Sequence, residues 1–330
     1  LCLGVAMDRF VVHRLAYDGA AQCFTLDFDF GLSPLTKAFP SRADFSLVIY
    51  TPDARTVASA RQGFRAATAA YYALFPEAFA RRSEQEGLWM PFTDIARVQD
   101  AEDFNFAFQE GASNIPWDEA HGIYSFRYIS PHWAMLWMPE RQEKPTPEFV
   151  QQKLAEDLQS DNPATRKAAQ IIMNCAGRNA QGGLQYTIGQ AHWAPHKTGY
   201  LGWYAMFPAN ADPDLGQLGR GPTTGTETMA AVDRDIAAHD KPGSFLDGFY
   251  FDGVDERPLD NYAAEQFAFA SAPLTFSPDT KRPILCGAFT SYKFLQRVAD
   301  KMHASGRLVM ANGIPSQFPF SLYYLDLGGS

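Results

Sequence analysis

Apolar and polar residues alternate regularly in the first part of the chain. Within residues 24–30 (FTLDFDF) every second residue is aromatic or aliphatic, and the residues between them are Thr or Asp. A period of two is typical of a β-strand with one face in water. Residues 11–15 and 45–50 are predicted to be further strands, because Gly, Pro and Asp turn formers separate the apolar runs. We therefore expect residues 1–60 to form an antiparallel β-sheet, the remnant of a sandwich.

The period changes to that of a helix after residue 60. Apolar residues recur every three to four positions from Phe64 to Leu74, and Pro76 is expected to kink or split the segment. Residues 61–86 are therefore predicted to be a linker helix between two parts of the chain.

From residue 87 onward, short apolar segments alternate with long polar or helical segments. Strands that alternate with helices indicate parallel βαβ units. No GxGxxG or GxxxxGK[ST] sequence follows any of the apolar segments, which argues against a doubly wound nucleotide-binding sheet. We expect residues 87–330 to form a (β/α)8 TIM-type barrel, an α/β fold of ~250 residues, although the count stops one strand short of eight. The predicted strands are residues 88–92, 104–108, 123–128, 201–207, 248–252, 307–312 and 321–326.

Three of the intervening helices have recognisable N-caps. Thr146 and Asn162 each precede a Pro, a residue favoured at the first helical position. Ser291 precedes a segment with apolar residues on one face, and Gly306 is expected to end that helix.

Composition narrows the class of protein. The 330 residues include 28 Lys and Arg against 37 Asp and Glu, a net charge of -9, and 46% of the residues are hydrophobic. Such a chain has enough apolar surface to form a folded core. An acidic chain without a cluster of Lys and Arg disfavours nucleic acid as a partner. No apolar run approaches the ~20 residues of a membrane-spanning helix, so no membrane span is expected.

The cysteines suggest no metal or redox motif. Cys2, Cys23, Cys175 and Cys286 are widely scattered, without a CxxC pair. Free thiols are the expected state, although Cys2 and Cys23 can be bridged if they lie on paired strands. The chain starts at Leu1 within an apolar run, which suggests a fragment or a processed product. The compartment and the oligomeric state stay open, with an extracytoplasmic or secreted location favoured.

His192 and His196 are four residues apart, a spacing that would place two metal ligands on one face of a helix. Pro195 lies between them and no HExxH glutamate is present, so a metal site is disfavoured and no cofactor is predicted. His192 is instead a candidate for the lining of a substrate groove, or a solvated loop residue. Asp212 and Asp214 indicate a structural loop first, with substrate contact as the second interpretation and Ca²⁺ binding as the third.

The sequence FLDGFYFDGVDERP at residues 245–258 carries the most information about function. Its aromatic strand delivers Asp252 to the carboxyl end, and Gly253 follows where the backbone must turn. In a (β/α)8 barrel the carboxyl ends of the strands surround the active site. Asp252 is therefore a candidate catalytic acid, and the structural alternative is an Asp that caps a helix or holds a turn.

The strand DGFYFDGV, the preceding sheet remnant and the later strand RLVMANG resemble (β/α)8 glycoside hydrolases with an N-terminal β-sandwich, of the α-galactosidase and endo-α-N-acetylgalactosaminidase kind. The resemblance implies hydrolysis of glycosidic bonds in a poly- or oligosaccharide, with Asp252 as nucleophile or charge stabiliser. Such hydrolysis needs two carboxyl groups, ~5–5.5 Å apart for retention and ~6.5–9.5 Å apart for inversion of the anomeric centre.

Three residues are candidates for the second carboxyl group. Asp326 ends the segment SLYYLD, Glu256 lies in the loop after Asp252, and Glu110 follows the segment FNFAFQ. Asp326 and Glu256 rank equally as the general acid/base, and Glu110 ranks as an acceptor for a sugar hydroxyl. As structural alternatives, Asp326 caps a helix and Glu256 is solvated. An ion pair with Arg127 is the corresponding alternative for Glu110.

Aromatic residues make up 14% of the chain, and four of them are candidates for stacking on sugar rings. Trp89 and Trp203 are the best placed by strand context, and Tyr128 and Tyr250 complete the set. Asn312, at the end of RLVMAN, can both donate to and accept from a sugar hydroxyl. The structural alternatives are core packing for the rings and a routine turn for Asn312.

The prediction is thus a glycoside hydrolase that acts on a carbohydrate substrate. A non-catalytic carbohydrate-binding or structural barrel is the first alternative, because acids can also bind hydroxyls or cap turns. A metal-dependent hydrolase built on His192 and His196 is the second. The first two differ in geometry: the enzyme requires two carboxyl groups within ~10 Å of each other at one aromatic-lined site.

Overall fold

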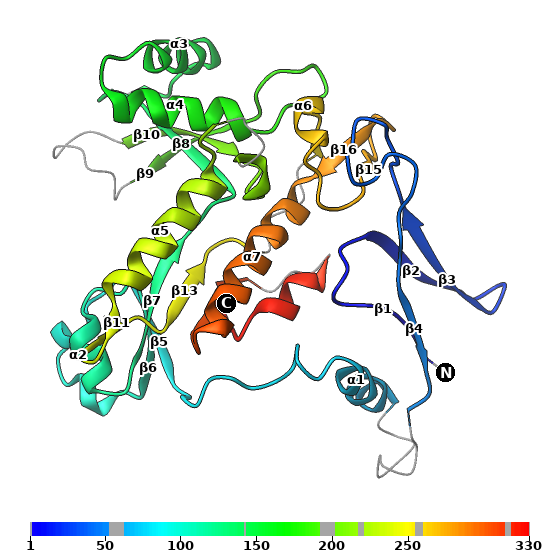
Figure 1. Cartoon of the computed structure of the whole chain (residues 1–330), viewed down its shortest axis with the longest axis horizontal. Helices are drawn as coiled ribbons and strands as arrows, with labels where there is room; N and C mark the ends of the chain where they lie inside the picture. Colours follow the sequence, from blue (N-terminus) through cyan, green and yellow to red (C-terminus); the bar gives the residue numbers. More distant parts are fainter. Residues whose placement is uncertain are drawn as a thin grey trace.

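A sheet of parallel strands forms the centre of the computed structural model, which describes residues 2–52, 63–141, 143–191, 202–216, 221–254, 260–313 and 318–329. The strands curl into half of a barrel (Figure 1). Every neighbouring pair in this sheet is parallel. The predicted (β/α)8 barrel is therefore wrong: within the described residues the sheet stays open. In spatial order the strands are β18 (Leu327–Gly329), β17 (Leu308–Asn312), β13 (Gly248–Phe251), β7 (Tyr124–Ile129), β6 (Phe106–Glu110) and β5 (Leu88–Pro91).

The central strands β13 and β17 are buried on both faces, which explains why they are almost wholly apolar. On the face that we call the helix face, Phe249, Phe251 and Val309 pack against α5 (Thr224–Ala238) and α7 (Gly287–Ala304). These two helices lie side by side in Figure 1. The opposite, inner face carries Phe126 and Tyr250 together with other apolar residues of β6 and β17.

The long connection from β7 to α5 forms a second layer with its own core, drawn at the top of Figure 1. Its strands make an antiparallel sheet in the order β8-β10-β9. The predicted strand 201–207 is confirmed as β10, but it belongs to this antiparallel sheet and not to the parallel series. Thr146 and Asn162 cap their helices as predicted. The elements are β8 (Trp133–Trp137), α3 (Pro147–Leu158), α4 (Pro163–Cys175), β9 (Thr187–Ala191) and β10 (Gly202–Pro208).

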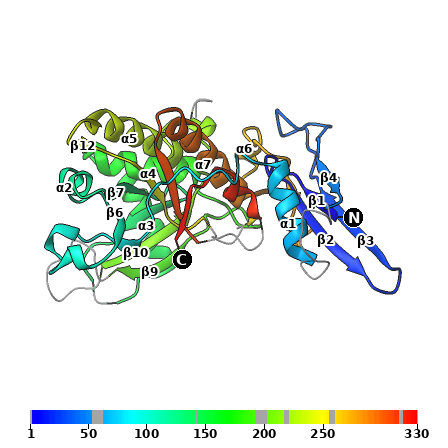
Figure 2. The ribbon, with the colours of Figure 1, turned by 90° about the horizontal axis from the view of Figure 1, so that it is seen from below.

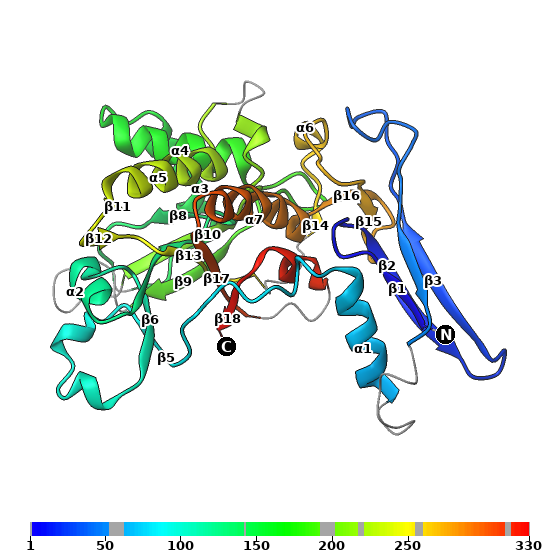
Figure 3. The same cartoon turned by 60° about the horizontal axis from the view of Figure 1, so that its bottom comes forward.

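Two predictions for the last third of the chain are wrong. Residues 321–326 do not form a strand, because Pro319–Tyr324 is a 3-10 helix and β18 starts only at Leu327. Ser291 does not cap its helix, since α7 begins at Gly287, directly after β16 (Pro283–Cys286). Figure 3 shows β17 and β18 at the edge of the sheet that faces the N-terminal strands.

The N-terminal region forms one end of an elongated molecule (Figure 2). Its strands form two antiparallel pairs, β1 (Cys2–Val5) with β4 (Leu47–Tyr50) and β2 (Val12–Asp18) with β3 (Cys23–Asp29). Within the segment predicted as a linker helix, the structure has the helix α1 (Gly63–Leu74), which ends two residues before Pro76. Phe10 packs its ring against the rings of Tyr292 and Tyr324, so this end is joined to the core of the helix face.

The remaining elements are short connections around these layers. All four cysteines are free in the structure, and Cys2 and Cys23 lie in different strand pairs. In the described part of the chain, no helix combines the length and the apolar character needed to cross a bilayer. The short elements are the 3-10 helices Ile95–Arg97 and Ala101–Asp103, α2 (Ile115–Ala120), β11 (Asp240–Lys241), β12 (Ser244–Phe245), β14 (Asp260–Asn261), α6 (Ala264–Phe267) and β15 (Thr275–Phe276).

Candidate active site

Polar side chains gather at the carboxyl ends of four adjacent strands of the parallel sheet. Glu110 is the last residue of β6, Asp252 directly follows β13, and Asn312 is the last residue of β17. Tyr128 lies near the end of β7, in register with Tyr250 of β13. Parallel strands place their carboxyl ends along one edge, so segments that are far apart in the sequence meet there.

Asp252 is held by two side-chain hydrogen bonds, one to each carboxylate oxygen. The Tyr128 hydroxyl donates to Oδ2 over 2.6 Å, and the Asn312 amide donates to Oδ1 over 2.8 Å. The backbone N–H of Asp252 donates to the carbonyl of Ile129 over 3.1 Å, which continues the pairing of β13 with β7 by one residue. Two neutral donors therefore orient this carboxylate, and none of the described residues forms an ion pair with it.

Glu110 is the second carboxyl group of this cluster. Its side chain is buried, with 2% of the residue exposed. Burial raises the pKa of Glu110 from 4.5 to about 7, and the negative charge of Asp252 adds to the rise. The nearby indole N–H of Trp89 lowers the pKa of Glu110 and so offsets part of this rise. The N–H is not placed for a hydrogen bond of normal geometry. The charge of one carboxyl group thus raises the pKa of the other, and Glu110 is protonated below about pH 7.

Aromatic rings line the inner face beside the two acids. The rings of Trp89 and Tyr250 are stacked with centroids 5.8 Å apart, and those of Tyr250 and Tyr128 are stacked at 6.1 Å. The ring of Phe92 lies 5.5 Å from that of Tyr128. Burial and the nearby carboxylates raise the pKa of both tyrosines, so their hydroxyls stay protonated and can donate.

Phe92 stands out by its backbone. Its φ of 53° lies in the left-handed region, which is unfavourable for a bulky residue, and its side chain is 65% exposed. Its N–H donates to the carbonyl of Glu110 over 3.0 Å, so the strained turn is attached to the end of β6. Gly111, the next residue after Glu110, has a φ of 100° that only glycine adopts readily. The strain therefore presents an aromatic ring to solvent next to the acids.

His132 lies behind the cluster, after the end of β7. Its ring is stacked on Phe251 with centroids 5.5 Å apart, and neither ring nitrogen has a hydrogen-bond partner among the described residues. Burial lowers the pKa of His132 to about 4, although the charge of Asp252 opposes the shift. His132 is therefore neutral near pH 7 and does not compensate the charge of Asp252.

Of the residues predicted from sequence, the structure brings Asp252, Glu110 and Asn312 together, with the rings of Trp89, Tyr128 and Tyr250. The suggested ion pair of Glu110 is not formed, since the Arg127 guanidinium lies 3.7 Å from Asp235 instead. Trp203 is not part of the cluster, because it lies on β10 and packs into the core of the second layer.

Asp326 is also placed elsewhere. It directly precedes β18, and its carboxylate accepts from the N–H of Val309, near the amino end of β17. Arg82 and His303 contact the same carboxylate at 3.0 and 2.9 Å, and the side chain is 0% exposed. The sequence places Asp326 at the end of a strand, whereas in the structure it lies before one and is occupied by an ion pair.

Several predictions lie outside the described residues or concern metals. Glu256, His192 and His196 are outside the described part of the chain. Asp212 accepts from the N–H of Asp214, which itself pairs with an arginine of α7, so this segment is a structural loop. Within the described ranges, no group of three His, Cys, Asp or Glu residues is arranged to hold a metal ion.

Sequence reasoning missed Phe92 and His132. Phe92 was expected to end a strand, and no sequence signal marks a non-glycine residue that will adopt a positive φ. His132 follows a predicted strand in the order Ser-Pro-His, and its position after that strand was the available signal.

Comparisons with protein-family models, with curated proteins and with solved structures found no match to this chain. The resemblance to sugar-cleaving barrels therefore stays a prediction, and the function is inferred from the geometry of the strand ends.

Proposed function

We propose that the chain is a glycoside hydrolase, with its active site at the carboxyl ends of β6, β7, β13 and β17. The observation that carries the proposal is the pair of carboxyl groups, Asp252 and Glu110, in different environments on one edge of the sheet. Two carboxyl groups with different protonation are the requirement for general acid catalysis of glycoside cleavage.

Asp252 is suited to the part of nucleophile or charge stabiliser. The transition state of glycoside cleavage resembles an oxocarbenium ion, so positive charge develops at the anomeric carbon. Tyr128 and Asn312 fix both carboxylate oxygens of Asp252 without neutralising them. A fixed anion costs no reorganisation when that charge develops.

Glu110 is suited to the part of proton donor, which revises its predicted part as a hydroxyl acceptor. With a pKa raised to about 7, it retains its proton at mildly acidic to neutral pH and can pass it to the leaving oxygen. The bond between the anomeric carbon and that oxygen then breaks, and water supplies the hydroxyl group to the sugar while its other proton restores the acid form of Glu110. The exposed ring of Phe92 and the half-exposed Tyr128 offer flat apolar surfaces for the C–H faces of a sugar.

The test is hydrolysis of a panel of oligo- and polysaccharides by the purified chain, with product anomers read by NMR. Asp252→Asn keeps both contacts, because its amide oxygen can accept from Asn312 while the Tyr128 hydroxyl accepts from its NH2 group. We expect Asp252→Asn and Glu110→Gln each to lower kcat at least about 10³-fold, by analogy with loss of one charged catalytic group.

Asp27→Asn on β3 is the matched control, since this exposed carboxylate pairs with Arg14 and lies in the N-terminal strands. It is expected to leave kcat unchanged. Full turnover in Asp252→Asn would overturn the proposal. Sugar binding without turnover in the unmodified chain would instead favour a non-catalytic carbohydrate-binding protein.

A further inference from the structure

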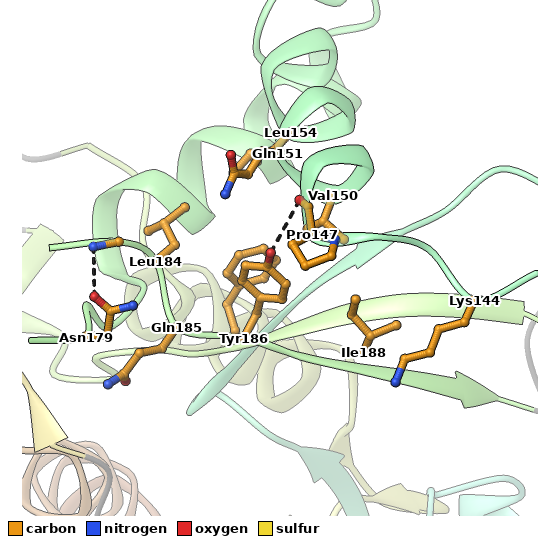
Figure 4. A pocket seen from close by; sticks show the side chains of 12 residues that line it. Lys144, Pro147, Val150, Gln151, Leu154, Asn179, Leu184, Gln185, Tyr186 and Ile188 are labelled. Atoms are coloured by element: carbon orange, nitrogen blue, oxygen red, sulfur yellow. Dashed lines mark hydrogen bonds between the residues drawn. The ribbon is translucent and has the colours of Figure 1, made fainter. Parts of the chain in front are cut away.

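The second layer, formed by the connection from β7 to α5, contains a cavity of about 800 Å³. It lies between α3 and the segment that leads into β9 (Figure 4). The size falls in the range of ~300–1,000 Å³ that is typical of sites for small organic ligands. None of the residues that line it belongs to the cluster around Asp252 and Glu110.

The centre of the cavity is an aromatic surface. The hydroxyl of Tyr186 donates to the carbonyl of Pro147 over 3.4 Å, which ties the ring to the first turn of α3. Phe207 of β10 is fully buried and supports the Tyr186 ring from one side, with centroids 5.2 Å apart. Tyr186 therefore presents a flat apolar surface whose orientation is set by two neighbouring elements.

Amide side chains surround this ring. Gln151 projects from α3 in Figure 4, and Asn179 accepts from the backbone N–H groups of Gln181 and Gly183, both over 3.0 Å. These bonds occupy the Asn179 oxygen, and among the described residues no acceptor is recorded for its NH2 group. Amide groups donate and accept at once, as sugar hydroxyls do, so the two kinds of group can satisfy each other.

The charge around the cavity excludes strongly charged ligands. Among the described residues that line it, Lys144 is the one side chain that is charged at neutral pH, and no carboxylate is present. A phosphorylated ligand needs several cations, and a cationic ligand needs an acid. A purely apolar ligand would cover the amides of Gln151 and Asn179 without a partner, which is unfavourable.

The lining residues extend to both sides of the Tyr186 ring. In Figure 4, Lys144 and Ile188 lie on one side of Tyr186, and Asn179 and Leu184 lie on the other. A ligand that contacts both sides must therefore extend across the ring.

We propose that this cavity is a second carbohydrate-binding site, which takes a short segment of a neutral polysaccharide with one sugar ring stacked on Tyr186. The class of ligand rests on the proposed function, because a polymer cleaved at the strand-end site can also be held here. The site itself shares no residue with the catalytic cluster, so it can be tested separately.

The experiment is affinity gel electrophoresis of the full chain in gels that contain soluble starch, xylan or galactomannan, one at a time. We expect at least one of these polymers to retard the chain. Tyr186→Ala and Gln151→Ala should each weaken that retardation about tenfold, whereas Tyr186→Phe, which keeps the ring, should retain most of it.

Gln152→Ala is the matched control. Gln152 is the next residue of α3, does not line the cavity, and donates to Glu156 on the exposed surface over 2.8 Å. It should leave retardation unchanged. If none of the polymers retards the chain, or if Tyr186→Ala and Gln151→Ala migrate like the unmodified chain, the second site is refuted.

The two proposals fail in distinguishable ways. A chain that hydrolyses a polysaccharide but whose retardation is unaffected by Tyr186→Ala retains the proposed function and loses the second site. A chain that hydrolyses none of the panel but whose retardation depends on Tyr186 and Gln151 retains the second site and loses the proposed function. Circular dichroism of each variant confirms that a loss of retardation is not a loss of fold.

Discussion

Replacement of Glu110 by Gln tests the electrostatics of the proposed active site through stability as well as activity. Gln preserves the size of the side chain but cannot ionise. In the wild type, burial and the charge of Asp252 disfavour the ionised form of Glu110. A rise in pKa from 4.5 to about 7 corresponds to about 3 kcal/mol, since one pH unit is ~1.36 kcal/mol. This is a large share of the stability of a typical domain, ~5–15 kcal/mol.

The sign of the effect follows from the two states of the chain. Because the folded protein binds the Glu110 proton more tightly than the unfolded chain, its contribution to stability is complete below pH 4.5 and is lost as the pH rises through about 7. Gln has no such dependence. We therefore expect the unfolding free energy of Glu110→Gln, relative to wild type, to increase by about 2–3 kcal/mol between about pH 4 and about pH 8.

Urea unfolding followed by tryptophan fluorescence measures this difference at each pH. Glu156→Gln on the exposed side of α3 reports the cost of the same substitution without burial. The quantity to compare is the unfolding free energy of Glu110→Gln minus that of wild type. The reasoning is refuted if this quantity stays constant with pH, or if it decreases as the pH rises. For the proposed hydrolase activity, wild-type kcat/KM should fall above about pH 7, as Glu110, the proposed proton donor, ionises.

Three further substitutions separate function from stability. Phe92→Asn should raise KM several-fold, because the exposed ring is lost, and steady-state kinetics measures this. Its stability should change by less than about 1 kcal/mol in urea unfolding, because Asn tolerates the left-handed backbone better and this offsets the lost ring contact. Asp118→Asn should stabilise the protein by about 2 kcal/mol near pH 8 but not near pH 4, because burial raises the pKa of Asp118 from 3.8 to about 6; unfolding curves at both pH values decide. Asp326→Ala should destabilise the fold by about 3–5 kcal/mol, since it leaves Arg82 and His303 without their buried partner. Thermal unfolding measures this, and an unchanged Tm would contradict the prediction.

Local pattern predicts most of the strands but not the way they assemble. The strands near residues 88, 106, 124, 248 and 308 are all present, because continuous apolar runs between turn formers are hard to satisfy otherwise. The segment 201–207 has the same pattern, yet it pairs antiparallel in the second layer. A short apolar run carries no information about the direction of the strand that pairs with it. Counting such runs therefore overestimates the number of parallel strands.

The candidate site, too, could be predicted only where local sequence determines the position of a residue. Asp252 could be predicted because the aromatic strand before it and Gly253 after it fix its place in the chain. Its partner could only be narrowed to three candidates, with Glu110 ranked as a hydroxyl acceptor, because the proximity of Glu110 depends on the spatial order of β13, β7 and β6. Asp326 follows an equally aromatic segment, but Pro319 opens a 3-10 helix there and moves the acid to the start of the next strand.

The contrast between Asp326 and the pair of Glu110 and Asp252 supports a functional part for the pair. Both sets of acids lie on the same sheet, near opposite ends of its strands. Asp326 is fully compensated, with a cation, a histidine and a backbone N–H on its two oxygens. Glu110 and Asp252 repel each other, no cation pairs with them in the described residues, and a strained Phe92 lies beside them. Burial without a cation does not by itself mark the pair, since Asp118 and Asp247 are also buried acids for which the described residues show no ion pair. What distinguishes Glu110 and Asp252 is their place at the carboxyl ends of neighbouring strands, beside stacked tyrosine rings and the strained Phe92, an arrangement that suits a catalytic pair.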